Sequence, residues 1–177
     1  MNKSSENYKL LWSFEFETPL GQMLAISGDD VLYFLGFADT PNIGSAIEKL
    51  RISLNADIII RQTPIIVLAQ EQINAYFNGK LTKFTIPIKL IGTPFQKSVW
   101  QELLNINYGT TSSYAAQSAM IGAPLAYRAV ANANGRNPLS IIVPCHRIIN
   151  SNGKLGGYNS GLDKKLWLLE HEKKYAK

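Results

Sequence analysis

The amino-terminal part of the chain alternates apolar and polar residues with a period of two. The stretches 10–16, 23–27 and 31–37 follow this pattern, and a Gly28-Asp29-Asp30 turn joins the last two. A period of two places successive side chains on opposite faces of a strand, and short polar turns join antiparallel neighbours. The pattern therefore predicts a small antiparallel hairpin or meander.

Two helices are expected after these strands. The first covers about 43–54, and the second begins with Thr63 as its capping residue and Pro64 in its first turn. Proline suits that position because the amide hydrogen it lacks would have no partner within the helix. Alternation returns over 84–90 and predicts a short extended segment. The Ile91-Gly92 step after it marks a domain boundary.

Beyond that boundary the pattern changes to short helices with explicit start signals. Thr93 and Gln96 have the spacing of a capping box, and Ser112 or Ser113 begins the next helix. Pro124 begins another, and the two short helices joined by a tight turn have the outline of a helix-turn-helix. Any helical hairpin in a small core would give the same outline.

The second helix of this pair favours the DNA-binding interpretation. Residues 126–133 carry small side chains and a single cation, Arg128, in place of a broad apolar stripe. Small side chains let a helix lie close to nucleic acid. After it, the β-branched run 141–143 predicts a strand that leads into Cys145, and 148–149 continue as a strand. A final amphipathic helix begins near Leu162.

Together these elements predict an α+β fold in two domains. Residues 1–91 would form a structural domain with a small antiparallel sheet and helices. Residues 92–177 would form a mostly helical domain that contains the helix-turn-helix and the active-site strand and turn.

Composition narrows the class of protein. The chain has 177 residues, 46% of them apolar and 18% charged, with one Cys and two His. This composition excludes disordered, collagen-like and disulfide-stapled proteins. One Cys and two His cannot make a tetrahedral zinc site without carboxylates, so we expect no metal and no cofactor. The chain shows no apolar run of signal-peptide or membrane-spanning length, which predicts a cytoplasmic protein without a membrane partner.

Charge is distributed unevenly along the chain. The formal charge is −1 over residues 1–89 and +6 over residues 90–177, and no Asp or Glu occurs from Leu103 to Leu162. That acid-free segment carries four cations, namely Arg128, Arg136, Arg147 and Lys154. A surface with cations and without anions suits a polyanion such as nucleic acid. A solvated, loop-rich face that happens to lack acids is the alternative.

The chain's one thiol lies beside an imidazole, in the sequence Pro144-Cys145-His146. A cysteine becomes a good nucleophile when a base or a positive charge favours its thiolate, and His146 could be that base. Side chains alternate along a strand, so the pair can meet only if the backbone turns there. The nearest acids that could orient the base are Asp163, Glu170 and Glu172, of which we favour Glu172. An inert, buried cysteine beside an unrelated histidine is the alternative.

The segment 141–147, IIVPCHR, resembles the O6-alkylguanine-DNA alkyltransferases. Four further segments share this resemblance: Arg128-Ala129-Val130, Asn137-Pro138, Gly156-Gly157-Tyr158 and 167–172. The resemblance extends from about Thr93 to Lys174, and the amino-terminal half carries no motif of comparable strength.

The resemblance implies a suicide DNA-repair protein. It implies a ribonuclease H-like first domain and a winged-helix-like second domain. The activity implied is irreversible transfer of a methyl or larger alkyl group from O6-alkylguanine, and from O4-alkylthymine, to Cys145 after base flipping. The partner implied is double-stranded DNA that contains O6-alkylguanine, bound by a monomer.

The resemblance also implies a role for each matching residue. Cys145 would be the nucleophile, His146 the base that acts through a water, and Glu172 the carboxylate that orients His146. Asn137 would support the active-site turn, and Tyr114 would donate a proton toward the departing guanine. Packing in a helix is the alternative for Tyr114.

Contacts with DNA and substrate are implied as well. Arg128 would enter the duplex and fill the gap left by the flipped nucleotide, with Tyr114, Ala126 and Ala131 beside it on the DNA. The substrate pocket would be lined by Val143, Ile148, Tyr158 and Asn159. The amino-terminal half lacks the thiols and imidazoles with which some family members bind zinc. The identities of residues 159 and 160 vary among relatives, so the alkyl size accepted stays open.

Three other functions compete with this one. Alkyltransferase-like proteins bind alkylated DNA without accepting the group, but they lack the cysteine that Cys145 supplies here. A helix-turn-helix regulator would leave Cys145 without a role. A cysteine hydrolase with a Cys-His-Glu triad would release many equivalents of product, whereas an alkyltransferase accepts one.

Overall fold

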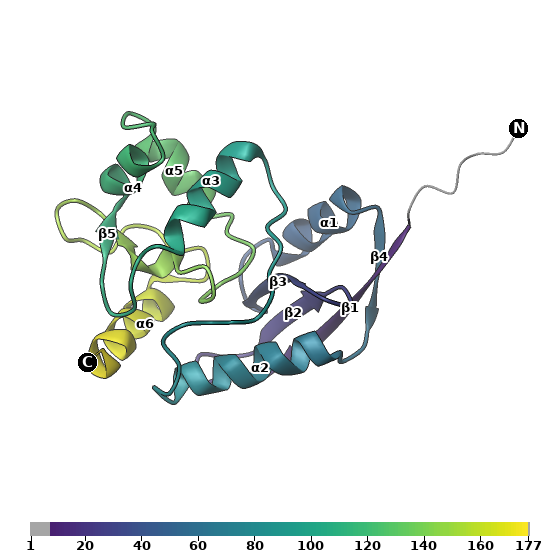
Figure 1. Cartoon of the computed structure of the whole chain (residues 1–177). Helices are drawn as coiled ribbons and strands as arrows, with labels where there is room; N and C mark the ends of the chain where they lie inside the picture. The colour runs from purple at the N-terminus through teal and green to yellow at the C-terminus, as the bar shows by residue number, and fades with distance from the viewer. Residues whose placement is uncertain (1–7, 177) are drawn as a thin grey trace, which may run out of the picture.

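The computed structural model describes residues 8–176 as two halves side by side, with the sheet on the right and the later helices on the left (Figure 1). The elements run in the order β1 (Lys9–Phe16), β2 (Met23–Ser27), β3 (Leu32–Phe37), α1 (Ile43–Ser53), β4 (Ala56–Ile60), α2 (Pro64–Phe77), α3 (Pro94–Leu103), β5 (Ser112–Ser113), α4 (Tyr114–Met120), α5 (Tyr127–Asn134), a 3-10 turn (Cys145–Arg147), β6 (Ile148–Ile149) and α6 (Leu162–Tyr175).

The sheet of the first half has the strand order β3-β2-β1-β4. The antiparallel pairs β1–β2 and β2–β3 confirm the predicted meander, but β4 runs parallel to β1. The prediction of a purely antiparallel sheet is therefore wrong at this edge. A parallel neighbour needs a crossover connection, and α1 supplies it. The sequence pattern missed β4 because this five-residue strand follows the helix almost directly, after Asn55 at a φ of 47°.

Helices cover both faces of this sheet. Buried residues of α2, such as Ile66 and Ile73, pack with Leu35 and Phe37, while Leu50 of α1 packs with Phe34 on the other face. Every residue of β3 is buried as a result. Strands covered on both faces read as continuous apolar runs, which explains the weak alternation of this segment.

The helix starts of the second half follow their capping signals. Thr93 and Gln96 form both hydrogen bonds of a capping box at α3, and the Ser113 side chain accepts from the Ala116 amide at α4. Helix α5 begins at Tyr127, three residues after the proline expected to open it. The intervening residues make a turn in which the Ala126 amide donates to the Ala123 carbonyl.

The predicted strand over 141–143 is absent, and a tight turn replaces it. Ile141 has a φ of 71°, the Ile142 amide donates to the Ser140 carbonyl, and the Val143 amide donates to the Leu139 carbonyl. A β-branched residue at positive φ is strained, and surrounding contacts must hold it there. The extended segment expected over 84–90 is likewise reduced to one isolated β-bridge, between Leu32 and Ile88.

A continuous group of buried apolar side chains joins the two halves. It includes Leu35 and Ile66 of the first half with Val99, Trp100 and Leu168 of the second. The boundary near residue 91 therefore stays a prediction. No helix within residues 8–176 is long and apolar enough to cross a membrane.

Candidate active site

Cys145 lies at the wall of a large cleft between the two halves. The cleft has a volume of about 1380 Å³ and is lined by residues of α1, α5 and the loop after β6. Cys145 is 8% exposed, and it begins the 3-10 turn Cys145–Arg147. In a 3-10 turn successive side chains point in different directions by about 120°. Cys145 therefore faces the cleft while the neighbouring His146 is fully buried behind it.

Asn137 holds the turn that carries the thiol. Its Nδ2 donates to the Val143 carbonyl at 2.7 Å and contacts the Cys145 sulfur at 3.2 Å, and its Oδ1 accepts from the Leu139 amide at 3.0 Å. One amide side chain thus bridges both ends of the strained turn and the sulfur.

The imidazole of His146 is held by Glu172 of α6. Nε2 and Oε1 are 2.7 Å apart, and both side chains are buried. A carboxylate only accepts hydrogen bonds, so Nε2 carries the proton and Nδ1 is the acceptor of the neutral ring. Nδ1 is buried without a partner in the part of the chain that the structure describes. The preference for Glu172 over Glu170 agrees with this placement, because Glu170 is exposed.

Glu172 also binds groups that sequence reasoning did not single out. Arg147 contacts both of its oxygens, Nε to Oε2 at 2.9 Å and Nη2 to Oε1 at 3.0 Å. The Tyr76 hydroxyl of α2 donates to Oε1 at 2.9 Å, and the Gly109 amide donates to Oε2 at 3.1 Å. Arg147 was counted as a surface cation, but it is 6% exposed. Its position in an apolar run was the sequence signal that Arg147 is buried. A buried arginine needs a carboxylate partner.

Burial is the largest influence on the pKa values of this group. It raises the pKa of the Cys145 thiol, which the hydrogen bond from Asn137 partly opposes. It lowers the pKa of His146, so the ring is neutral at neutral pH and can accept a proton. Burial would also raise the pKa of Glu172, but His146 and Arg147 outweigh it and hold that pKa well below its usual range.

Lys165 is a second buried cation beside the site that sequence reasoning missed. Its Nζ donates to the carbonyls of Ile148, Leu155 and Gly157. Burial lowers its pKa to about 8, and its charge lowers the pKa of the Cys145 thiol. The signal was its spacing in α6, because residues 165, 168 and 172 all fall on the buried face.

Tyr114, the first residue of α4, lines the cleft and contacts the loop after β6. Its hydroxyl donates to the Gly157 carbonyl at 3.3 Å, and burial raises its pKa. Gly156 has a φ of +70°, and a Cβ there would come within 2.9 Å of the Tyr114 ring. Only glycine allows this close approach in that backbone conformation.

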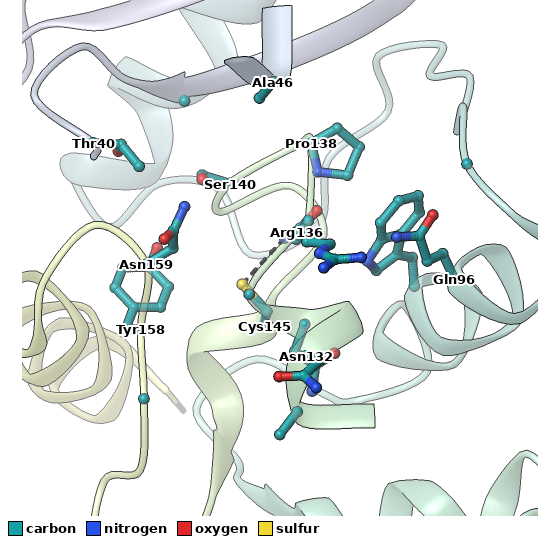
Figure 2. Close-up of a pocket in the computed structure, with 18 of the residues that line it drawn as sticks. Thr40, Ala46, Gln96, Asn132, Arg136, Pro138, Ser140, Cys145, Tyr158 and Asn159 are labelled. Carbon is teal, nitrogen blue, oxygen red and sulfur yellow. Dashed lines mark hydrogen bonds between the residues drawn. The ribbon is translucent and has the colours of Figure 1, made fainter. Parts of the chain in front are cut away.

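The predicted pocket residues fall into two groups. Tyr158 and Asn159 line the cleft and face the sulfur of Cys145 from one side (Figure 2). Val143 and Ile148 are fully buried and pack in the core, and neither lines the cleft. The Val143 carbonyl instead accepts from Asn137.

Three of the predicted DNA-contacting residues lie on α5 or at its start, and the fourth, Tyr114, begins α4. Arg128 is exposed at the mouth of the same cleft, with its guanidinium carbon 5.9 Å from the centre of the Tyr127 ring. Ala131 lines the cleft one turn later, and Ala126 caps the helix. A cation and small side chains thus border the opening that leads to the thiol. The geometry unites a buried thiol at the cleft wall, a neutral imidazole held by an ionised carboxylate, and a cationic rim.

Two family models match almost the entire chain. One, described as the DNA binding domain of 6-O-methylguanine DNA methyltransferase, matches residues 94–174, and the other, described as its ribonuclease-like domain, matches residues 10–90. A methylated-DNA–protein-cysteine methyltransferase of Methanosarcina barkeri is 45% identical over 156 residues, 88% of this chain and 93% of that protein. One of Mycobacterium leprae is 56% identical over 105 residues, 59% of this chain but 64% of that protein, slightly under two thirds of its length.

Solved structures resemble the chain over nearly its full length. The O6-methylguanine methyltransferase of Mycobacterium tuberculosis superposes with a TM-score of 0.79 at 40% identity, and the match covers 94% of this chain and 95% of that one. The same organism's OGT in complex with DNA superposes with a TM-score of 0.77 at 40% identity and covers 94% of both chains. These matches confirm the α+β fold and the resemblance of the Pro-Cys-His-Arg segment, and the chain belongs to the 6-O-methylguanine DNA methyltransferase family.

Proposed function

We propose that this protein is a methylated-DNA–protein-cysteine S-methyltransferase that repairs O6-alkylguanine in double-stranded DNA by irreversible transfer to Cys145. The observation that carries the proposal is the placement of one thiol at a cleft, backed by His146 and Glu172 and held by Asn137. Membership of the family supports it. O4-alkylthymine is proposed as a second substrate, because its alkyl carbon is bonded to an equivalent exocyclic oxygen.

The substrate base must leave the helix before it can react. An alkyl carbon inside a stacked duplex is out of reach of the sulfur of Cys145, a residue that is 8% exposed at the side of a cleft. Flipping a nucleotide out costs a few kcal/mol. Arg128, exposed on α5, would offset part of this cost by occupying the vacated space, with Ala126 and Ala131 close to the backbone of the DNA.

The transfer is an in-line displacement at the alkyl carbon. The bond between that carbon and Cys145 Sγ forms as the bond to guanine O6 breaks, and the electron pair of the broken bond stays with the purine. The thiol proton leaves toward His146 Nδ1 through a bridging water, and the purine gains a proton with help from the Tyr114 hydroxyl. The net products are a thioether and guanine, so the balance requires no cofactor.

Burial shifts the pKa values of both Cys145 and His146. Burial raises the pKa of the Cys145 thiol and keeps it protonated in the resting protein. A base that is neutral and buried can take the proton when the substrate fills the cleft. The Glu172 charge then stabilises the imidazolium that forms.

Intact-protein and peptide mass after incubation with excess duplex DNA containing one O6-methylguanine tests the proposal. We expect a gain of one methyl group on the peptide that carries Cys145, ending at one equivalent, and no gain in Cys145→Ala. That variant should still bind the DNA, because the thiol makes no part of the cationic rim. Transfer that continues in Cys145→Ala would refute the mechanism.

Other results of the same experiment identify the competing functions. Release of many product equivalents with an unmodified thiol would indicate a hydrolase. Tight binding of the lesion without transfer would indicate a damage-binding protein. Size-exclusion chromatography with light scattering, with and without DNA, tests the proposal that the protein acts as a monomer.

A further inference from the structure

The segment that follows β3 in the first half contacts the loop between β6 and α6, which carries Tyr158 and Asn159. Thr40 Oγ1 lies 2.8 Å from Ser160 Oγ, and Asp39 Oδ2 lies 2.6 Å from Lys164 Nζ. These partners are more than 100 residues apart in the sequence. Two polar contacts therefore join the β3–α1 loop to the second half, one to the end of the loop before α6 and one to the first turn of α6.

The Thr40 side of this contact is rigidly supported. The Thr40 amide donates to the Phe37 carbonyl at 3.0 Å, and the Ile43 amide at the start of α1 donates to the Thr40 carbonyl at 3.2 Å. Phe37 is fully buried at the end of β3, and its ring lies beneath Lys164, with Nζ 5.2 Å from the ring centre. These contacts fix the backbone of Thr40 between the end of β3 and the start of α1.

On the Ser160 side, Tyr158 packs against the buried core, whereas Asn159 is exposed. Lys165 holds the carbonyls of Leu155 and Gly157, which leaves the tip of the loop, residues 158–160, beyond its reach. The tip forms a turn in which the Gly161 amide donates to the Tyr158 carbonyl at 3.1 Å. The Thr40–Ser160 hydrogen bond ties the Ser160 end of this tip to the β3–α1 loop.

The tip carries the side chains that face the sulfur. Tyr158 and Asn159 stand on one side of Cys145, and Thr40 lies next to Asn159 at the rim of the cleft (Figure 2). A shift of Ser160 moves the Asn159 side chain with it, because Asn159 is its direct neighbour in the chain. The distance from the loop tip, residues 158–160, to the Cys145 sulfur sets the space available for the alkyl group of the substrate.

We propose that Thr40 is a positioning residue through which the amino-terminal domain limits the size of the alkyl group that Cys145 accepts. It holds the loop tip through Ser160, and the Asp39–Lys164 pair holds the start of α6 in the same place. The inference rests on the proposed function and adds a specificity role for a residue of the first half. Small groups fit the closed pocket well, whereas bulky ones require the tip to move outward.

The test compares Thr40→Val with the wild-type protein on two duplexes, one with a single O6-methylguanine and one with a single O6-benzylguanine. Valine keeps the shape of threonine and removes the hydrogen bond. We expect the ratio of the benzyl to the methyl transfer rate constants to rise by about two- to tenfold, the range of effect of one hydrogen bond. A general loss of stability would lower both rates and leave the ratio unchanged.

Four further variants isolate the contact. Ser160→Ala should raise the ratio as Thr40→Val does, and the double variant should add little, because both remove the same bond. Thr40→Ser keeps the hydroxyl and should restore the wild-type ratio. Thr18→Val is the matched control, since its hydroxyl contacts the Gly21 carbonyl in the distant β1–β2 turn.

The outcomes separate this inference from the function on which it rests. Absence of methyl transfer by the wild-type protein would refute the proposed function. Normal methyl transfer with the same rate ratio in wild type, Thr40→Val and Ser160→Ala would refute the positioning role of Thr40 alone.

Discussion

At the scale of single residues, the site depends on how buried charges are satisfied. Glu172 accepts five hydrogen bonds, two of them from Arg147 and one each from Tyr76, Gly109 and His146. Burying a carboxylate is unfavourable unless hydrogen bonds and opposite charge compensate for it. The dense set of donors keeps Glu172 ionised, and an ionised Glu172 fixes the tautomer of the histidine.

Lys165 gives the residue-scale prediction. Its positive charge favours the thiolate of Cys145, so Lys165→Met should raise the thiol pKa and slow alkylation by iodoacetamide near neutral pH. A thiol pKa that is higher by one leaves about a tenth as much thiolate to react. Since burial lowers the pKa of Lys165 to about 8, the lysine loses its charge above that pH. The ratio of wild-type to variant rates should therefore be largest below pH 8 and decrease above it.

The pH profile of thiol alkylation measures this effect, and Lys173→Met is the control. Lys173 is an exposed cation on the same helix, so its removal changes net charge equally without touching the pocket. Identical profiles for wild type and Lys165→Met would show that the buried ammonium does not act on the thiol.

At the scale of elements, helix α5 is built for close approach rather than for burial alone. Its inner face buries Val130 and Ala133 against Trp100, whose indole nitrogen donates to the Ala133 carbonyl at 2.8 Å. Its outer face carries Arg128 and the small Ala131. The inner contacts hold the helix in place, and the outer face is left available to a duplex.

Replacing Arg128 tests the role of this helix. Arg128→Ala should slow methyl transfer from duplex DNA more than transfer from the free base O6-benzylguanine, because only the duplex requires a flipped nucleotide to be replaced. Single-turnover rates on both substrates measure the difference. Arg61→Ala, which removes an arginine that lies over Trp12 in the first half, is the control. Equal losses on both substrates would exclude insertion into the duplex.

At the scale of the whole molecule, charge is arranged for a polyanion. The acid-free segment from Leu103 to Leu162 retains three exposed cations, Arg128, Arg136 and Lys154. The fourth, Arg147, is neutralised by Glu172 inside the protein. The attraction to DNA should therefore come from fewer cations than the sequence suggests.

This arrangement predicts a moderate dependence of DNA affinity on salt. Each phosphate contact contributes about −0.9 to the slope of log affinity against log salt, so three contacts predict a slope of about −3. Fluorescence anisotropy of a labelled duplex over a salt series measures it. Transfer from the free base should change little over the same series. A DNA affinity that does not change with salt would contradict the role assigned to this surface.

Local signals in the sequence determined the helices and the centre of the chemistry. Thr63, Thr93 and Ser113 cap the helices they were expected to cap, because capping joins a side chain to an amide only three residues away. The sequence also placed Cys145 beside His146 and favoured Glu172 as the orienting acid, and the structure brings Glu172 to His146.

Tertiary structure alone decided the features that depend on distant partners. The direction of β4 depends on a crossover, the strained turn before Cys145 depends on Asn137, and the burial of Arg147 depends on Glu172. Lys165 looks in sequence like one more surface cation, yet it is buried on backbone carbonyls. Each of these outcomes depends on partners that are distant in the sequence, so a local pattern can indicate that a residue is buried but does not identify its partner.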